Sequence, residues 1–528
     1  MNFSITNTKK NICNHLKENK NLLLCCLIST FLWGLIAHAY GFLHNNLSHD
    51  VLNAFTALPG EEGWKIELGR FFVPIYRMFF RGPLSLPWLI GLIGMFWLSL
   101  AVYLTVRLLK IENKTLIVLL AGLMTTNITL ISQIATYLYE FDFNALALLA
   151  SVGAVTFWRT QNRWKQFLLA PLCLLLSLSI YQAYITVTVT LVILLSLIDL
   201  LEQKKIRSIL TEGVIGILFL LIGMILYLLL GKIVYAATGI TPQPRTDMFQ
   251  LDNIVNTVRS IFSLLSPTLT NLRNNILHSA YPQILLSILL WSSALLAFIQ
   301  FIKLLIVKHF EPARSILACL LLLVLPLGMN CIYIIIAGQG MHDLMCYASW
   351  FVYIFLLYFT TQINTPAMLP GRFSKVTRFL AYTLAIFLLF QNIVIANTCY
   401  VKKEMEATAT LSTMTRVVAA LEEHEDYRYG ETTVAFIGAD SSNENIYGFE
   451  KVDNITGMWS KTAIPADTSL YYYNVYKTYF DYVLNYPINL CSDEVHAELV
   501  NDPRVQALPS FPDQNAIQMI DGVLVVKM

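Results

Sequence analysis

The chain has 528 residues, of which 56% are hydrophobic and only 13% are charged. This composition, with a mean hydropathy of +0.59, is typical of a polytopic membrane protein and excludes a soluble globular protein of this length. The formal net charge of +2 argues against nucleic acid as a partner.

About eleven apolar segments recur along the chain, most of them long enough to cross about 30 Å of hydrocarbon as a helix. Membrane lipid is therefore expected to surround most of the chain. We expect spans at 22–40, 86–106, 115–135, 145–158, 167–180, 185–201, 209–234, 284–307, 316–337, 347–359 and 379–396.

Lysine and arginine residues gather in alternate connections between these segments, and cytoplasmic loops carry such an excess. The N-terminal tail, residues 1–20, belongs to the same positively charged set. The pattern predicts an inside N-terminus, an outside C-terminus and a membrane domain over residues 21–398. The sizeable polar loops, 41–87 and 239–283, then lie on the outer face, where we expect the chemistry to take place.

After the last span the apolar runs stop and Asp, Glu, Asn and Tyr become common, so residues 399–528 are predicted to form a soluble domain. Residues 433–438 predict a buried strand, and Asp521-Gly522 predicts the turn of a hairpin over 517–526. The expected fold class is an all-α polytopic membrane protein with a small C-terminal α/β domain. An amphipathic helix leaving the membrane is indicated by Leu411, Met414, Val418 and Leu421, which recur at helical spacing.

The first outer loop holds the first candidate functional residues. Asp50 lies among apolar residues, where the alternatives are a catalytic acid, a helix N-cap or a solvated loop residue. Glu67 is a second acid there, and Arg70, Arg77 and Arg81 recur among aromatic residues. Arginine presents a planar fork of donors that fits phosphate oxygens, so these three could hold a lipid phosphate or anchor to anionic head groups.

Further polar residues lie at predicted outer ends of spans. Glu140 and Asp142 follow Tyr139 between two apolar segments, where charges are costly unless they face water or a cavity. Acids among aromatic rings suit a sugar site, although Asp142 could instead cap the next helix. The remaining groups are Tyr181 with Gln182, and His342 with Asp343. They are candidates for sugar contacts or for interfacial anchors.

In their order along the chain these segments resemble the polytopic serotype-converting glucosyltransferases of enteric bacteria and their phages. The resemblance covers nearly the whole chain and depends on the spacing of the motifs relative to the spans. The matching motifs are Asp50, Gly69-Arg70-Phe71, Tyr139-Glu140-Phe141-Asp142, Ser179-Ile180-Tyr181-Gln182-Ala183-Tyr184, and the end of the chain from Ile520 to Lys527.

The resemblance implies a GT-C type glycosyltransferase in the bacterial inner membrane, which takes glucose from a polyprenyl-phosphate donor. The acceptor would be lipid-linked O-antigen or another surface glycan on the periplasmic face, where the C-terminal domain would also lie. The reaction would be an inverting displacement, and no cofactor is expected. The implied donor-phosphate residues are Arg70, Arg77 and Arg81, and the implied sugar or acceptor residues are Tyr139, Tyr181, Gln182, His342 and Asp343.

The resemblance also implies a catalytic acid in the first outer loop, where Asp50 is the matching position. Members of the family often carry two acids together there, whereas Asp50 is followed by Val51. The base is therefore open among Asp50, Glu67, Glu140 and Asp142. A divalent ion held by Glu140 and Asp142 is the alternative to a metal-free site.

Two other functions remain open. A lipid-linked sugar flippase or transporter would also have many spans, but it should carry charges in mid-span or paired broken helices, and most spans here lack charges. An O-antigen polymerase or ligase depends on a large outer loop with arginines, which loop 239–283 offers. The soluble C-terminal tail counts against this second alternative.

Overall fold

The structure is a computed structural model of the whole chain. It describes residues 2–44, 52, 59–82, 84–243, 295, 298–299, 301–302, 311–332, 342–362, 371–438, 449, 452 and 476–528. Asp50, the predicted catalytic acid, lies outside the described residues. So does most of the predicted span 284–307.

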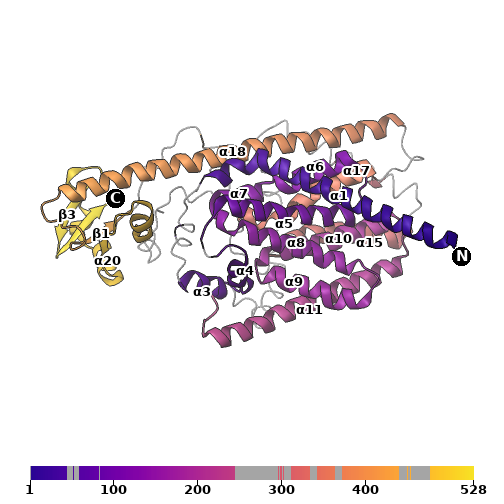
Figure 1. Ribbon diagram of the computed structural model, residues 1–528, viewed down its shortest axis with the longest axis horizontal. Helices are drawn as coiled ribbons and strands as arrows, with labels where there is room; N and C mark the ends of the chain where they lie inside the picture. The colour runs from indigo at the N-terminus through magenta and orange to yellow at the C-terminus, as the bar shows by residue number, and fades with distance from the viewer. Residues whose placement is uncertain are drawn as a thin grey trace.

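Helices dominate the described part of the chain, which confirms the predicted fold class. Seven of them are long and apolar enough to cross a membrane, and three shorter apolar helices accompany them. Figure 1 shows these helices side by side in one elongated bundle. The described α-helices are α1 (Asn2–Leu43), α3 (Pro59–Glu67), α4 (Phe72–Phe80), α5 (Pro87–Leu108), α6 (Lys114–Thr125), α7 (Ile128–Tyr137), α8 (Phe141–Trp158), α9 (Ala170–Leu178), α10 (Ile185–Leu201), α11 (Ile206–Thr238), α15 (Pro312–Met329), α17 (Trp350–Gln362) and α18 (Gly371–Glu423), followed in the C-terminal part by α20 (Asp493–Val500) and α21 (Pro503–Gln506).

The helix is interrupted where the sequence predicted one continuous span at 115–135. The Asn127 side-chain amide donates to the carbonyls of Leu123 and Met124 at the end of α6, and its oxygen accepts from the backbone of Leu130 in α7. Asn127 therefore ends one helix and caps the next. As a result the predicted span 115–135 is divided: its first part is the short apolar helix α6, and α7 with α8 forms a candidate span over Ile128–Trp158, which includes the predicted span 145–158.

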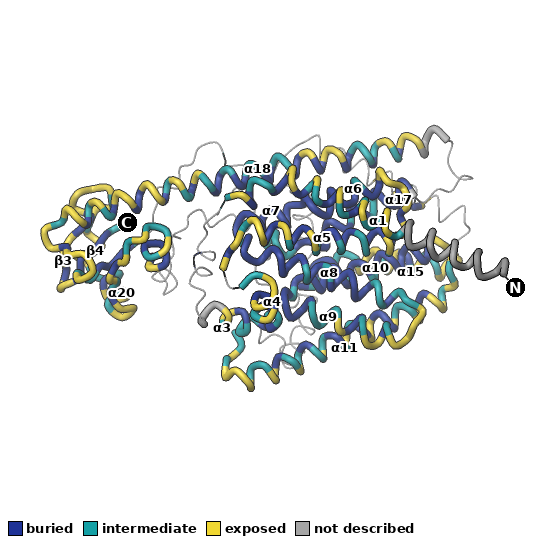
Figure 2. Tube along the Cα trace, viewed as in Figure 1, coloured by how far each residue is buried: buried dark blue, intermediate teal, exposed yellow. Residues whose placement is uncertain are grey.

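The start of α8 lies deep in the bundle, as the dark blue tube in Figure 2 shows. A Cβ atom at Gly94 of α5 would lie 2.4 Å from the Phe141 ring, so only glycine lets the two helices approach this closely. Phe141 and Phe143 are fully buried. This packing fixes the two acidic residues that flank Phe141.

The last helix, α18, joins the membrane bundle to the C-terminal part of the chain (Figure 1). Its 53 residues correspond to roughly 80 Å, far more than the ~30 Å of hydrocarbon in a bilayer. The predicted amphipathic helix is the end of α18: Met414, Val417 and Leu421 are buried against the C-terminal sheet, whereas Leu411 is 45% exposed. The predicted domain boundary at residue 399 falls inside this helix.

The C-terminal sheet has the strand order β2-β1-β4-β3. Strand β1 (Thr433–Ile437) pairs in parallel with β2 (Asn489–Leu490) and β4 (Val523–Lys527), and β3 (Ile517–Ile520) is antiparallel to β4. The predicted strand at 433–438 and the predicted hairpin are confirmed. Asp521 and Gly522 both have positive φ, as a tight two-residue turn requires.

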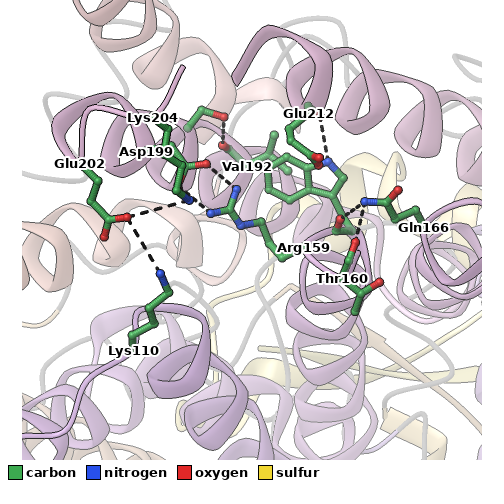
Figure 3. A network of polar contacts seen from close by, with 11 residues as sticks. Lys110, Arg159, Thr160, Gln166, Val192, Asp199, Glu202, Lys204 and Glu212 are labelled. Carbon is green, nitrogen blue, oxygen red and sulfur yellow. Dashed lines mark hydrogen bonds and ion pairs between the residues drawn. The ribbon is translucent and has the colours of Figure 1, made fainter. Parts of the chain in front are cut away.

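A charged network ties the helices together at the far end of α8 (Figure 3). The Arg159 guanidinium donates to both oxygens of Asp199 at 2.7 Å, and Lys204 contacts the same carboxylate. Asp199 is 5% exposed, so this pairing is largely removed from water. Trp158 donates to the carbonyl of Glu212 at 3.0 Å, which adds α11 to the α8–α10 contact.

We expect Asp199→Asn to lower the free energy of unfolding by about 2–3 kcal/mol, because it removes a buried charge from a bidentate pair. Glu202→Gln is the matched control. Glu202 contacts Lys110 and Lys204 at about 4 Å on the surface and should change stability by less than about 1 kcal/mol. Thermal unfolding of the purified proteins measures the stability of both variants. Equal losses of stability in Asp199→Asn and Glu202→Gln would contradict the prediction.

Candidate active site

The predicted polar residues gather where the α3–α4 segment packs against the start of α8. Figure 1 shows α3 and α4 at the end of the bundle from which α18 extends toward the C-terminal sheet. The 3-10 turn η1 (Leu138–Glu140) leads into α8, and a second 3-10 turn, η3 (Gln182–Tyr184), leads into α10. These turns place side chains from distant parts of the sequence around one buried volume.

Glu140 is the centre of the first cluster. Its Oε1 forms an ion pair with the Lys65 ammonium, and Arg70 Nη1 donates to both carboxylate oxygens at 3.0 and 3.2 Å. Lys65 is 2% exposed and Glu140 8%, so two cations share one acid away from water. Burial lowers the pKa of the Arg70 guanidinium, but Glu140 together with Tyr181, Tyr139 and Tyr137 raises it above the usual value. Arg70 is therefore a permanent cation.

Asp142 pairs with a different arginine. Arg81 Nε donates to Asp142 Oδ2 at 2.9 Å, and both side chains are 0% exposed. Arg81 also donates to the carbonyls of Tyr139 and Leu84. The predicted phosphate ligand Arg81 thus holds the end of α4 against the start of α8.

Arg77 completes the group of buried cations. It is 2% exposed, and its guanidinium lies over the rings of Tyr139 at 5.9 Å and Phe143 at 5.7 Å. Among the described residues the site therefore brings together four cations, Lys65, Arg70, Arg77 and Arg81, and two carboxylates, Glu140 and Asp142. Three arginines gathered in one buried cluster are suited to an anionic ligand.

A clamp formed by two side chains fixes the turn that carries Arg70. Gln182 Nε2 donates to the carbonyl of Leu68 at 2.7 Å and to the Tyr227 hydroxyl at 2.9 Å, and that hydroxyl donates to the carbonyl of Gly69 at 3.1 Å. Gly69 has φ +74°, and a Cβ there would lie 2.2 Å from the Tyr227 oxygen. The turn therefore requires glycine, and Gln182 positions Arg70. The predicted contact of Gln182 with sugar remains a prediction.

Tyr181 lies directly beside this turn. The Arg70 guanidinium sits 4.8 Å from the centre of its ring. Burial raises the pKa of the Tyr181 phenol above its usual value, with Arg70 opposing the shift, so the hydroxyl stays protonated at neutral pH. It is therefore available as a hydrogen-bond donor.

The other predicted residues form contacts of their own. Glu67 Oε2 accepts from Gln243 at 2.6 Å, beyond the end of α11. The Asp343 carbonyl accepts from Thr129 at the start of α7, and the His342 carbonyl accepts from Met345. The described contacts thus place Tyr139, Tyr181 and the three arginines around Glu140 and Asp142. The predicted sugar contacts of His342 and Asp343 remain predictions.

Lys65 and Tyr227 were not predicted from the sequence. Lys65 follows Glu61 and Glu62, a pattern that usually marks a solvated helix face. Tyr227 lies within the long apolar helix α11, where its hydroxyl is an unusual polar atom and was the available signal.

Glu140 and Asp142, which the sequence suggested as ligands of a divalent ion, are both paired with cationic side chains. Within the described ranges, no group of three or more His, Cys, Asp or Glu side chains is arranged to hold a metal ion. The site as described is built around cations of the protein itself.

Comparison with known proteins identifies a family. The family whose profile matches the chain is Glucosyl transferase GtrII, over residues 39–359. This range is more than half of the chain and contains every paired residue of the site described above. The same comparison with curated proteins and with solved structures gave no match. The predicted resemblance to serotype-converting glucosyltransferases is confirmed over residues 39–359, and the chain belongs to the GtrII family of glucosyl transferases.

Proposed function

We propose that this glucosyl transferase uses a polyprenyl-phosphate-linked glucose donor and an O-antigen or other lipid-linked surface glycan as acceptor. The observation that carries this proposal is the buried cluster of three arginines and a lysine around Glu140 and Asp142. A nucleotide-sugar donor would usually rely on a metal bound by acids, whereas here the acids neutralise arginine and lysine. The three arginines among these cations present the planar fork of donors that fits phosphate oxygens.

The charge of the ligand rises during such a reaction. The donor is a phosphate diester with about one negative charge, and the departing polyprenyl phosphate is a monoester with about −1.5 to −2 at neutral pH. Cations held rigidly in advance bind the second species better than the first, so they lower the barrier to transfer. Arg70, fixed by Glu140 and by the Gly69 turn, is the best-positioned of these cations.

The bond changes follow an inverting displacement. The acceptor hydroxyl attacks the anomeric carbon, the bond from that carbon to the phosphate oxygen breaks, and a carboxylate takes the hydroxyl proton. Glu140 and Asp142 are each engaged by cations, which makes them poor bases. Their pairing supports Asp50 as the base, and Glu67 is the next candidate.

The membrane orientation belongs to the same proposal. Basic residues such as Arg159, Lys204 and Arg314 gather at the end of the bundle opposite the site. Since cytoplasmic ends carry such an excess, this supports a cytoplasmic N-terminus, with the site and the C-terminal domain on the periplasmic face of the inner membrane.

The test uses membranes with wild-type protein, supplied with polyprenyl-phosphate glucose and a lipid-linked glycan, and follows glucosyl transfer by mass spectrometry. We expect Asp50→Asn to lower the rate by about 10²–10⁴-fold, the usual contribution of a general base. Glu62→Gln, an exposed acid of the same loop, is the matched control and should keep the wild-type rate.

Each other outcome changes the proposal. If Asp50→Asn keeps the rate while wild type transfers glucose, the base is assigned to Glu67 and tested in the same way. If wild type transfers no glucose from this donor, the proposed donor class is wrong.

A further inference from the structure

A second set of buried polar side chains adjoins the cationic cluster. The Asn144 amide nitrogen lies 3.5 Å from Glu140 Oε2. Tyr181 packs under Arg70, and its ring contacts that of Tyr184 edge to face at 5.6 Å. Asn144, Tyr181 and Tyr184 are each no more than 4% exposed. They extend the site from the cations into the bundle.

Each of these side chains has a polar atom that forms no hydrogen bond with a described residue. Among the residues that the structure describes, the Asn144 oxygen, the hydroxyls of Tyr181 and Tyr184, and Arg70 Nε have no hydrogen-bond partner. A buried polar atom without a partner is destabilising, and native proteins keep few of them. Four in adjoining side chains indicate a place for a polar ligand.

The chemistry of these atoms distinguishes the ligand from phosphate. The Asn144 nitrogen faces Glu140, so the atom of the amide without a described partner is its oxygen, which can only accept. A phosphate diester has no proton to donate to it. A sugar has several hydroxyls, each able to donate and to accept, and the faces of tyrosine rings suit its C–H surfaces.

We infer that Asn144, Tyr181 and Tyr184 form the pocket for the glucosyl group of the donor, with its phosphate at Arg70. The distances support the donor sugar over the acceptor sugar. The anomeric carbon is joined directly to the phosphate oxygen, so the donor sugar must lie next to the phosphate site, and Tyr181 touches Arg70. This inference depends on the proposed function, and it adds Asn144 and Tyr184 as residues that determine sugar binding.

The test measures the affinity of the full-length protein in nanodiscs for two probes, polyprenyl-phosphate glucose and polyprenyl phosphate. Asn144→Ala and Tyr184→Phe should weaken binding of the glucose-bearing lipid by about 3–10-fold each, the effect of one lost hydrogen bond. Both variants should bind polyprenyl phosphate within about twofold of wild type. Tyr184→Phe keeps the ring, so its packing in the bundle is retained.

Tyr400→Phe is the matched control. Tyr400 is equally buried, but its hydroxyl is bonded to His38 in α1, and the variant should leave the ratio of the two affinities unchanged. Loss of affinity for both lipids in equal measure, or for neither, would overturn the sugar pocket. Failure of wild type to bind either lipid would instead overturn the proposed function.

Discussion

Arg70→Ala is expected to lower kcat for glucosyl transfer by about 10²–10³-fold, the usual cost of removing one preorganised donor at a developing negative charge. Among the four cations, Arg70 is the one that the structure holds most firmly. Glu140 holds its guanidinium, the Tyr181 ring supports one side, and its own turn is clamped by Gln182 and Tyr227. A side chain fixed so firmly can stabilise the departing phosphate without first reorganising.

Two variants sharpen the Arg70 prediction. Arg70→Lys keeps the charge but loses the planar fork, so it should recover only part of the rate. Arg107→Ala removes an arginine at the other end of α5, where it contacts Tyr103 on the surface, and should have the wild-type kcat. A wild-type kcat in Arg70→Ala, measured with saturating donor, would remove Arg70 from the catalytic site.

Glu140→Ala should reduce the free energy of unfolding by about 3–5 kcal/mol, because it leaves two buried cations without their shared carboxylate. Lys65 is 2% exposed and cannot reach water without moving α3. The loss should appear as a lower midpoint of thermal unfolding in nanodiscs. Glucosyl transfer should fall as well, since Arg70 loses the group that orients it.

The stability prediction for Glu140 has its own control. Glu311→Ala removes an exposed acid that precedes α15 and should leave the unfolding midpoint unchanged. A midpoint equal to that of wild type in Glu140→Ala would show that the Lys65–Glu140–Arg70 cluster does not hold α3 and α4 against α8.

Much of the fold could be predicted because its signals are local. The Asp521-Gly522 pair between two short runs of strand-forming residues specifies the hairpin, and long apolar runs specify helices such as α5 and α10. The break at Asn127 could not be predicted in this way. It depends on whether a side chain inside an apolar run bonds back to one helix and forward to the next, and that choice is made by tertiary packing.

The pairing of residues within the site also could not be predicted from local sequence. Sequence alone named Arg70, Arg81, Glu140 and Asp142 as candidates, since charges beside apolar segments are costly. Which acid meets which cation depends on how α3 and α4 fold back on α8, with partners about 60 to 75 residues apart in sequence. Lys65 had no local signal at all.

The measurement that tests the central claim most directly is a cryo-EM structure of the protein in nanodiscs with polyprenyl-phosphate glucose bound. The account predicts that the phosphate lies within hydrogen-bond distance of Arg70, beside the Glu140 carboxylate, and that the glucose lies against Tyr181. A phosphate bound away from Arg70, Arg77 and Lys65 would contradict it.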